Sequence, residues 1–275
     1  MDSQTTETTY RLGFIGAGKL AGSVIRGLIR AKFCRPGEIL AGEPNEIARN
    51  ALQNELGISI TAGNAEVAER ADTILLGVKP AVLLPVVREI TGRLHDKRVI
   101  SLAAGIRLCS MERMAPARFM RALTNTPSAV CRAGTALARG SRSTDEDVDL
   151  AHRIFSAIGV VVHVTEDQID AVTALAGSGP AFVYTVIEAL AEGGKKMGLP
   201  SDVALTLATQ TVLGAAQLAS ESKLSPEELR RMVVTPGGTT AAGLAAMQKL
   251  KTSEGFIAAI EAATKRGREM ARENL

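Results

Sequence analysis

Apolar residues in the first part of the chain gather in short continuous runs separated by amphipathic stretches. The apolar runs occupy residues 10–16, 38–42, 57–61, 72–78, 98–104, 117–123, 134–140 and 160–165. Stretches with helical periodicity, such as 19–31, 45–56 and 144–159, lie between several of them. Continuous apolar strands are typical of a parallel sheet that helices cover on both faces. The pattern predicts an α/β fold, a doubly wound parallel sheet over residues 1–165.

The pattern changes near Glu166, after which every segment has helical periodicity. These segments are 166–198 with a break at Gly179-Pro180, 201–222, 225–233, a stretch after Gly238, and 253–275. Several of the helices are apolar around most of their circumference, and such helices must be buried. Residues 166–275 are too few to bury so many apolar faces by themselves. We therefore expect an all-helical domain over 166–275 that forms a homodimer.

Composition and charge narrow the class of protein. The net charge is +3 with both signs interspersed, so no basic stripe for nucleic acid is present. Cys34, Cys109 and Cys131 have neither disulfide nor metal-ligand spacing, which favours a reducing compartment. The polar segment MDSQTTETTY lacks the apolar part of a signal peptide, and no apolar run approaches the roughly 20 residues that span a bilayer. We expect a soluble cytoplasmic protein without a metal site, bound neither to nucleic acid nor to a membrane.

The stretch GFIGAGKLAG follows the first predicted strand and opens the first predicted helix. Gly16, Gly18 and Ala21 form the pattern G-x-G-x-x-A, which in this context is typical of dinucleotide binding. Gly16 makes the tight turn, Gly18 lets the backbone approach a pyrophosphate, and Ala21 lets helix and strand pack closely. The alternative is a plain strand–helix turn.

The second strand ends at Glu43, close to the position of the acidic residue that binds a ribose diol in such folds. A carboxylate there favours NADH because it repels a 2′-phosphate. Arg49 lies farther along the predicted helix and could reach the same place, so NADPH stays open. Glu43 could also be simply solvated.

Other strand ends should meet at the same edge of the sheet, because ligands in open α/β sheets bind beyond the carboxyl ends of strands. These ends contribute Lys79, Ala103, Ala104, Asn125, Thr126 and Pro127. Pro80 is well suited to begin a helix after Lys79. Asn64 could touch the adenosine side, but the local sequence favours a helix-capping role.

The stretch VVTPGGTTAAGL, residues 233–244, places glycines and threonine hydroxyls where a helix begins. A helix N-terminus presents unpaired N–H groups and the positive end of the helix dipole, which together suit a small anion. The alternative is a capped turn between two helices.

The chain offers few groups for acid–base catalysis. His95, His152 and His163 are the only histidines, and none lies near a predicted strand end of the cofactor edge. Hydride transfer suits such a site, since the cofactor carries the difficult chemistry. The chain shares features with β-hydroxyacid dehydrogenases, but in AGSGPAFVY position 183 is Val where those enzymes carry the catalytic Lys. An imine, which is electrophilic once protonated, is therefore a better substrate than an alcohol.

From end to end the chain resembles the pyrroline-5-carboxylate reductases of proline biosynthesis. The blocks GFIGAGKLA, VKP, AAG, TNTP, IDAVTALAGSGPAF, GGKKMGLP and TPGGTTAAGL stand in the family's order and spacing. The resemblance implies an NADPH- or NADH-dependent reductase with a Rossmann domain and a helical domain that interlocks in a homodimer. Larger rings, such as a decamer, also occur in the family. The implied substrate is pyrroline-5-carboxylate and the product is proline.

The resemblance also implies roles for particular residues. The implied cofactor contacts are Gly16, Ala17, Gly18, Lys19, Leu20, Glu43, Asn64, Val78, Lys79 and Ala104. The implied substrate contacts are Glu166, Thr235, Gly237, Gly238, Thr239 and Thr240. Thr240 is also the implied catalytic residue, because its hydroxyl hydrogen-bonds the ring nitrogen. Glu166 fits a structural role at a helix start equally well.

The chain departs from the family pattern at three of these places. Glu43 replaces a small polar residue, Met232 stands where some relatives have Asn, and Thr235 replaces Ser. Two alternatives stay open: a reductase of another cyclic imine carboxylate, and a dinucleotide-sensing regulator without catalysis.

Overall fold

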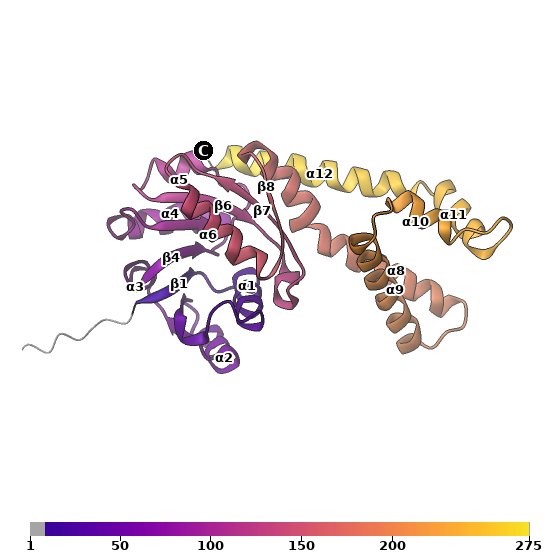
Figure 1. Cartoon of the computed structure of the whole chain (residues 1–275), viewed down its shortest axis with the longest axis horizontal. Helices are drawn as coiled ribbons and strands as arrows, with labels where there is room; N and C mark the ends of the chain where they lie inside the picture. The colour runs from indigo at the N-terminus through magenta and orange to yellow at the C-terminus, as the bar shows by residue number, and fades with distance from the viewer. Residues whose placement is uncertain (1–8, 275) are drawn as a thin grey trace, which may run out of the picture. The chain divides into compact units, whose positions relative to one another are not determined.

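A computed structural model of the chain describes residues 9–274 (Figure 1). By their internal contacts these residues form two compact units. The first contains the residues up to Ser178 and those from Ala262 onwards, and the second is Gly179–Glu261. The residues before Thr9, most of the polar segment from which a signal peptide was excluded, lie outside the described range. The domain boundary expected at residue 165 stays a prediction.

The first unit is built around an eight-stranded sheet with the order β3-β2-β1-β4-β5-β6-β7-β8. The strands are β1 Tyr10–Ile15, β2 Ile39–Gly42, β3 Ser59–Thr61, β4 Ala71–Leu76, β5 Arg98–Ser101, β6 Arg118–Leu123, β7 Ala133–Arg139 and β8 Gly159–His163. The helices of this part are α1 Lys19–Arg30, α2 Glu46–Leu56, α3 Asn64–Arg70, α4 Pro80–Ile90, α5 Leu108–Glu112 and α6 Asp145–Ser156, with 3₁₀ turns η1 Pro36–Glu38, η2 Thr91–Arg93 and η3 Thr126–Val130. The α/β class predicted from the apolar runs is confirmed.

Both faces of the sheet are buried over its central strands, which explains why these strands read as continuous apolar runs. Phe14 and Ile15 are successive residues of β1 and both are fully buried, yet they belong to different hydrophobic clusters. Phe14 packs in a cluster that includes residues of α1 and α6, whereas Ile15 packs with residues of α3 and α4. Adjacent strand residues point to opposite faces, so a strand covered on both sides needs apolar residues at every position.

The apolar pattern predicts a wholly parallel sheet, but one pair of strands is antiparallel. β6 and β7 pair antiparallel, with Leu123 opposite Ala136, while the other neighbouring strands pair parallel. Only the turn η3 and a few flanking residues connect β6 to β7. A connection without a crossover helix returns the chain beside the strand it has just left, which forces antiparallel pairing.

After β8 the described chain is helical, as predicted. It forms η4 Glu166–Gln168, α7 Ile169–Val172, a π-helical turn η5 Thr173–Gly177, α8 Gly179–Lys196, α9 Ser201–Glu221, α10 Pro226–Met232, α11 Thr239–Lys249 and α12 Thr252–Glu273. The break expected at Gly179-Pro180 is wrong in detail. The chain passes through a π-helical turn just before this pair and continues directly into α8. Pro180 lies in the first turn of α8, where a missing N–H costs no hydrogen bond.

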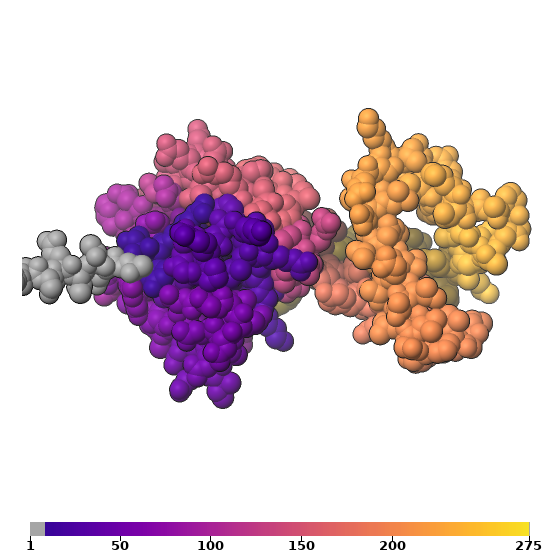
Figure 2. All heavy atoms as spheres, turned by 60° about the horizontal axis from the view of Figure 1, so that its bottom comes forward, coloured from indigo at the N-terminus to yellow at the C-terminus, as the bar shows by residue number. Residues whose placement is uncertain are grey.

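The second unit has a very small core. Its buried cluster consists of Ala191, Ala204 and Ala208, with Ile187 packed against it. The same unit contains an apolar pocket of about 270 Å³, lined by Phe182, Thr185, Thr252, Gly255, Phe256 and Ala259. Figure 2 shows an opening between the orange and the yellow atoms of this unit. An isolated unit with so little burial lacks the apolar contacts that stabilise a domain.

Two helical segments, Glu166–Lys196 and Ser201–Glu221, are long and apolar enough to cross a bilayer by length and composition. The expectation that no segment reaches this length is therefore wrong. That expectation counted uninterrupted apolar residues, whereas Ala-, Leu- and Thr-rich helices with scattered polar residues reach the same average hydropathy. Length and composition alone are weak support for a membrane span, because helices that pack in soluble proteins meet the same criterion.

Asp147, in the first turn of α6, joins the starts of β5 and β6. Its side chain is fully buried; Arg98 Nε lies 2.7 Å from Oδ1 and Arg118 Nε 3.1 Å from Oδ2. Burial would raise the pKa of the carboxyl, but the N–H of Thr144, the guanidinium of Arg98 and the charge of Arg118 hold it below its ordinary value. A lowered pKa in the folded state means that this group stabilises the fold at neutral pH.

Asp147→Asn should lower the free energy of unfolding at pH 7 by about 3 kcal/mol, since it leaves two arginines without their buried partner. The difference from the wild-type protein should shrink as the pH falls below about 4, where the carboxyl takes up a proton in the unfolded chain, and should be lost once the pH passes below its lowered pKa in the folded protein. Urea unfolding at several pH values measures it. Asp149→Asn, an exposed change on the same helix, is the control and should have little effect. A constant difference across the pH range would contradict the role of the charge.

Candidate active site

The carboxyl edge of the sheet begins at the turn between β1 and α1. Gly16 has φ of +84°, and a Cβ there would lie 2.6 Å from Val78 Cγ1. A Cβ at Gly77 would lie 2.7 Å from Ala21 Cβ. Small residues at these positions therefore let β1, β4 and α1 approach one another closely, and Gly16 also requires a left-handed backbone.

Gly18 differs from Gly16 because the space beside it is open. It is the N-cap residue of α1, with no side-chain capping bond, and no heavy atom lies within 4 Å of the place of its missing Cβ. Ala17 is buried, Lys19 is exposed and Leu20 is half-buried. The N–H groups in the first turn of α1 are therefore accessible to a ligand, and a helix N-terminus of this kind suits a phosphate group.

Glu43 and Arg49 meet at the end of β2. Glu43 Oε1 accepts a hydrogen bond from the backbone N–H of Asn45 at 3.0 Å. Arg49 Nη1 donates to the carbonyls of Glu43 at 2.9 Å and Pro44 at 2.8 Å. The carboxylate and the guanidinium thus both lie where dinucleotide-binding folds recognise the adenosine ribose.

The remaining predicted cofactor residues follow β3, β4 and β5. Val78 packs against the turn at Gly16, and Lys79 is the N-cap residue of α4, with Pro80 opening the helix as expected. Ala104, after β5, is half-buried against the cluster of Leu123, Ala136, Ala138 and Ile169. The capping role expected for Asn64 is wrong. Gly63 is the N-cap residue of α3, and Asn64 Nδ2 donates to Glu89 Oε2 at 3.0 Å.

Glu166 makes contacts within the first unit that the sequence did not foresee. Its Oε1 accepts from the backbone N–H of Leu108 at 2.6 Å and lies 3.2 Å from Arg121 Nη1. Arg121 is only 3% exposed, and its Nη2 donates to the carbonyl of Ala103 at 3.4 Å. Burial lowers the pKa of the Arg121 guanidinium, and the charge of Glu166 opposes this. The signal for this pair was Arg121, a charged residue in the interior of the apolar run RFMRAL.

The predicted substrate turn lies in the second unit. Gly237 has φ of +72°, the N–H of Gly238 donates to the carbonyl of Thr235 at 3.0 Å, and Gly238 is the N-cap residue of α11. A Cβ at Gly238 would collide with Thr235 Oγ1. α11 carries no side-chain capping bond, and Thr239 is exposed while Thr240 is half-buried. The backbone N–H groups at the start of α11 are therefore open to an anion.

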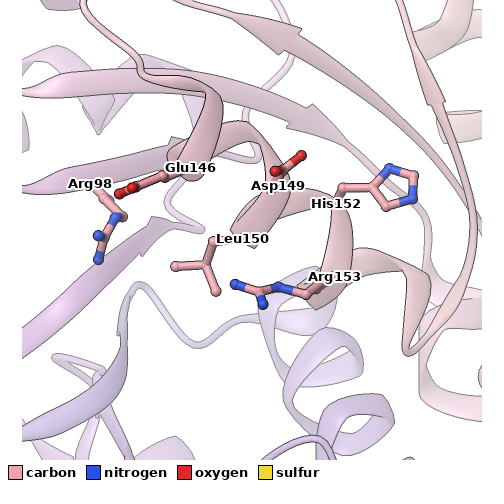
Figure 3. Close-up of a pocket in the computed structure, with 6 residues that line it drawn as sticks. All are labelled: Arg98, Glu146, Asp149, Leu150, His152 and Arg153. Carbon is pink, nitrogen blue, oxygen red and sulfur yellow. The ribbon is translucent and has the colours of Figure 1, made fainter.

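The histidines lie apart from these residues. His152 Nδ1 and His163 Nε2 are 3.0 Å apart, so one ring donates a hydrogen bond to the other. A surface pocket of about 500 Å³ near His152 is lined by Arg98, Glu146, Asp149, Leu150, His152 and Arg153 (Figure 3). Arg98 begins β5, so this pocket lies toward the amino ends of the strands. Within residues 9–274 no group of three or more His, Cys, Asp or Glu side chains could hold a metal ion.

Two family models match separate parts of the chain. A family model described as pyrroline-5-carboxylate reductase dimerisation matches residues 166–270. One described as NADP oxidoreductase, coenzyme F420-dependent, matches residues 11–105. The pyrroline-5-carboxylate reductase of Glycine max is 39% identical over 95% of this chain and 96% of its own length.

Two solved structures are similar over nearly the whole chain. A pyrroline-5-carboxylate reductase from Coxiella burnetii has a TM-score of 0.86 and 34% identity, covering 96% of this chain and 99% of its own. A pyrroline carboxylate reductase from Plasmodium falciparum, solved with NADP bound, has a TM-score of 0.88 and 27% identity, covering 95% and 98%.

The dimerisation match covers both helical segments that are long enough to cross a bilayer. Their exposed apolar residues, among them Leu205, Leu207, Leu213 and Leu218 of α9, therefore belong to a region that associates with a second copy. This confirms the homodimer that the apolar helices predict. The chain is a soluble enzyme. With 39% identity over nearly its full length to a curated member, the chain belongs to the pyrroline-5-carboxylate reductases, NAD(P)H-dependent oxidoreductases of proline biosynthesis.

Proposed function

We propose that this chain reduces Δ1-pyrroline-5-carboxylate to L-proline with residues of the two units in distinct roles. The observation that carries the assignment of roles is the open N-terminus of α11, which begins at Thr239 and follows a turn that contains Thr235, Gly237 and Gly238. The substrate is a small carboxylate, and the positive end of a helix dipole with free N–H groups stabilises such an anion.

In this proposal the backbone around Thr235, Gly237, Gly238 and Thr239 binds the substrate carboxylate. The hydroxyl of Thr240 hydrogen-bonds the ring nitrogen, which holds the C=N bond in one orientation. Since no histidine or lysine is among the proposed substrate contacts, the chain contributes mainly by orientation, with the imine arriving protonated or taking a proton from water. The bound dinucleotide supplies the hydride that is added to C5 of the ring.

The cofactor is proposed to bind along the carboxyl edge of the sheet. The open space beside Gly18 admits a pyrophosphate to the start of α1, and Lys19, Leu20, Val78 and Lys79 flank it. Ala104 leaves room for the nicotinamide, while Glu43 and Asn64 lie toward the adenosine. The relative from Plasmodium falciparum binds NADP. Here Arg49 favours NADPH and Glu43 favours NADH, so we propose that the chain accepts both.

The substrate turn and the cofactor edge belong to different units of one chain. We propose that the homodimer brings the turn of one protomer to the cofactor of its partner, and that dimers assemble further into a ring such as a decamer. Glu166 acts through Arg121 and Leu108, which its carboxylate contacts, or touches the substrate directly. The three cysteines are all free thiols, which supports a reducing compartment, the cytoplasm.

The activity itself is tested by the oxidation of NADPH and NADH at 340 nm with pyrroline-5-carboxylate and purified protein. Rapid oxidation that depends on the substrate, with proline as the product, is the expected result. An inactive protein that still binds NADPH would point to another cyclic imine carboxylate, such as a six-membered ring. Failure with these imines as well would leave a dinucleotide sensor.

Thr240→Ala should lower kcat by about 100-fold, because it removes the only side-chain hydrogen bond proposed for the reacting C=N group. The KM for NADPH should stay within about twofold, since Thr240 lies in the other unit from the predicted cofactor residues. Steady-state kinetics give both values. Thr185→Ala, an exposed threonine of α8, is the control. Unchanged turnover would remove Thr240 from the mechanism.

Glu43→Ser should raise the ratio of kcat/KM for NADPH over NADH by roughly tenfold, because it removes a charge that repels the 2′-phosphate. Arg49→Ala should change the ratio in the opposite direction. Glu46→Ser, the neighbouring exposed carboxylate in the first turn of α2, is the matched control. If Glu43→Ser and Glu46→Ser have equal effects, Glu43 does not face the ribose.

A further inference from the structure

The helical turn η5, Thr173–Gly177, is π-helical, although it lies between two α-helical segments. The N–H of Ser178 donates to the carbonyl of Thr173 at 2.8 Å, a bond between residues five apart. A π-helical turn disturbs the regular sequence of i to i+4 bonds, and such turns occur frequently at functional sites. A turn of this kind needs other partners for the backbone groups that it releases.

The carbonyl of Ala176 in this turn receives such a partner from a distant part of the chain. Asn125 Nδ2 donates to it at 3.1 Å, and Asn125 Oδ1 accepts from the backbone N–H of Gly134 in β7 at 3.2 Å. The amide therefore uses its donor and its acceptor at the same time. It joins the end of β6, the start of β7 and the π-helical turn.

Asn125 occupies the place where the pairing of β6 and β7 would continue. The last backbone pair is Leu123 opposite Ala136. Beyond it the hydroxyls of Thr124 and Thr135 are 2.8 Å apart and buried, and then Asn125 meets Gly134. Side-chain hydrogen bonds thus extend the pairing of β6 and β7 by two residue pairs, Thr124 with Thr135 and Asn125 with Gly134. Of these side chains, Asn125 also reaches the π-helical turn.

The π-helical turn adjoins the part of the first unit that is proposed to face the nicotinamide. Val172, the residue before it, packs with Ala104 against the cluster of Leu123, Ala136, Ala138 and Ile169. A Cβ at Gly177 would lie 3.9 Å from Leu123 Cδ2. A shift of the turn would therefore be felt by the side chains that pack around Ala104.

We propose that Asn125 is a positioning residue for the reduction: by holding the carbonyl of Ala176, it fixes the π-helical turn beside Ala104 and so the placement of the reacting ring. The inference rests on the proposed function for the nature of that ring. It makes a specific demand on residue 125, which must donate to one backbone group and accept from another.

Asn125→Asp tests this demand because the two side chains have nearly the same shape. An ionised aspartate still accepts from Gly134 but repels the carbonyl of Ala176, whereas a protonated aspartate can donate to it. The two groups that hydrogen-bond the Asn125 side chain are backbone groups, which do not titrate. We expect kcat of Asn125→Asp to fall by about 10- to 100-fold at pH 8. Activity relative to the wild-type protein should recover as the pH is lowered toward 5.

Asn125→Ala should lose kcat by a similar factor at every pH, with the KM for NADPH within about twofold. The double variant Thr124→Val with Thr135→Val is the matched control. It removes the neighbouring step of the strand pairing without touching the turn, and its kcat should stay near that of the wild-type protein. Hydrogen exchange at residues 169–178 should accelerate in both Asn125 variants and not in the control.

Three results would overturn the proposal. The first is a normal kcat for Asn125→Ala, and the second is an equal loss of kcat at every pH for the Ala and Asp variants. The third is loss of folding in both variants, because the amide would then serve stability alone. Thermal unfolding followed by circular dichroism decides the last point. If the wild-type protein itself fails to reduce pyrroline-5-carboxylate, the proposed function is wrong. Hydrogen exchange at residues 169–178 then still decides whether Asn125 holds the turn.

Discussion

Close backbone packing at the carboxyl edge of the sheet is the constraint on which the cofactor half depends. Gly16, Gly77 and Ala21 lie at the crossing of β1, β4 and α1, where an added Cβ would come within 3 Å of its neighbours at both glycines. The same contacts direct the start of α1 toward the open space beside Gly18. The crossing of β1, β4 and α1 thus packs one side of the turn tightly and leaves the side at Gly18 open.

The helical unit, in contrast, is loosely packed, because its apolar residues have too few partners within the unit. Three buried alanines form its core, while leucines of α9 stay exposed. Association with a second copy removes that surface from water, and burial of apolar area is the main source of stability in such interfaces. The turn at Thr235–Thr240 belongs to this unit, so the proposed substrate half depends on a fold that is completed by dimerisation.

Buried and half-buried polar side chains link elements that the apolar pattern treats separately. Asp147 joins α6 to β5 and β6, Arg121 joins β6 to Glu166, and Asn125 joins β6 and β7 to the π-helical turn. Each of these groups satisfies partners that would be costly to leave unpaired in a buried place. The arrangement of the elements around Ala104 thus depends on a few specific contacts as well as on apolar packing.

Much of this molecule is determined by its sequence alone, because local patterns report local physics. Apolar runs located the strands, glycine spacing located the turn at Gly16, and helices without a polar face indicated dimerisation. Only the tertiary structure decided the antiparallel pairing of β7, the π-helical turn before Gly179, and the partners of Asn64, Glu166 and Asn125. These features depend on contacts between residues far apart in the chain, and periodicity carries no information about which distant groups will meet.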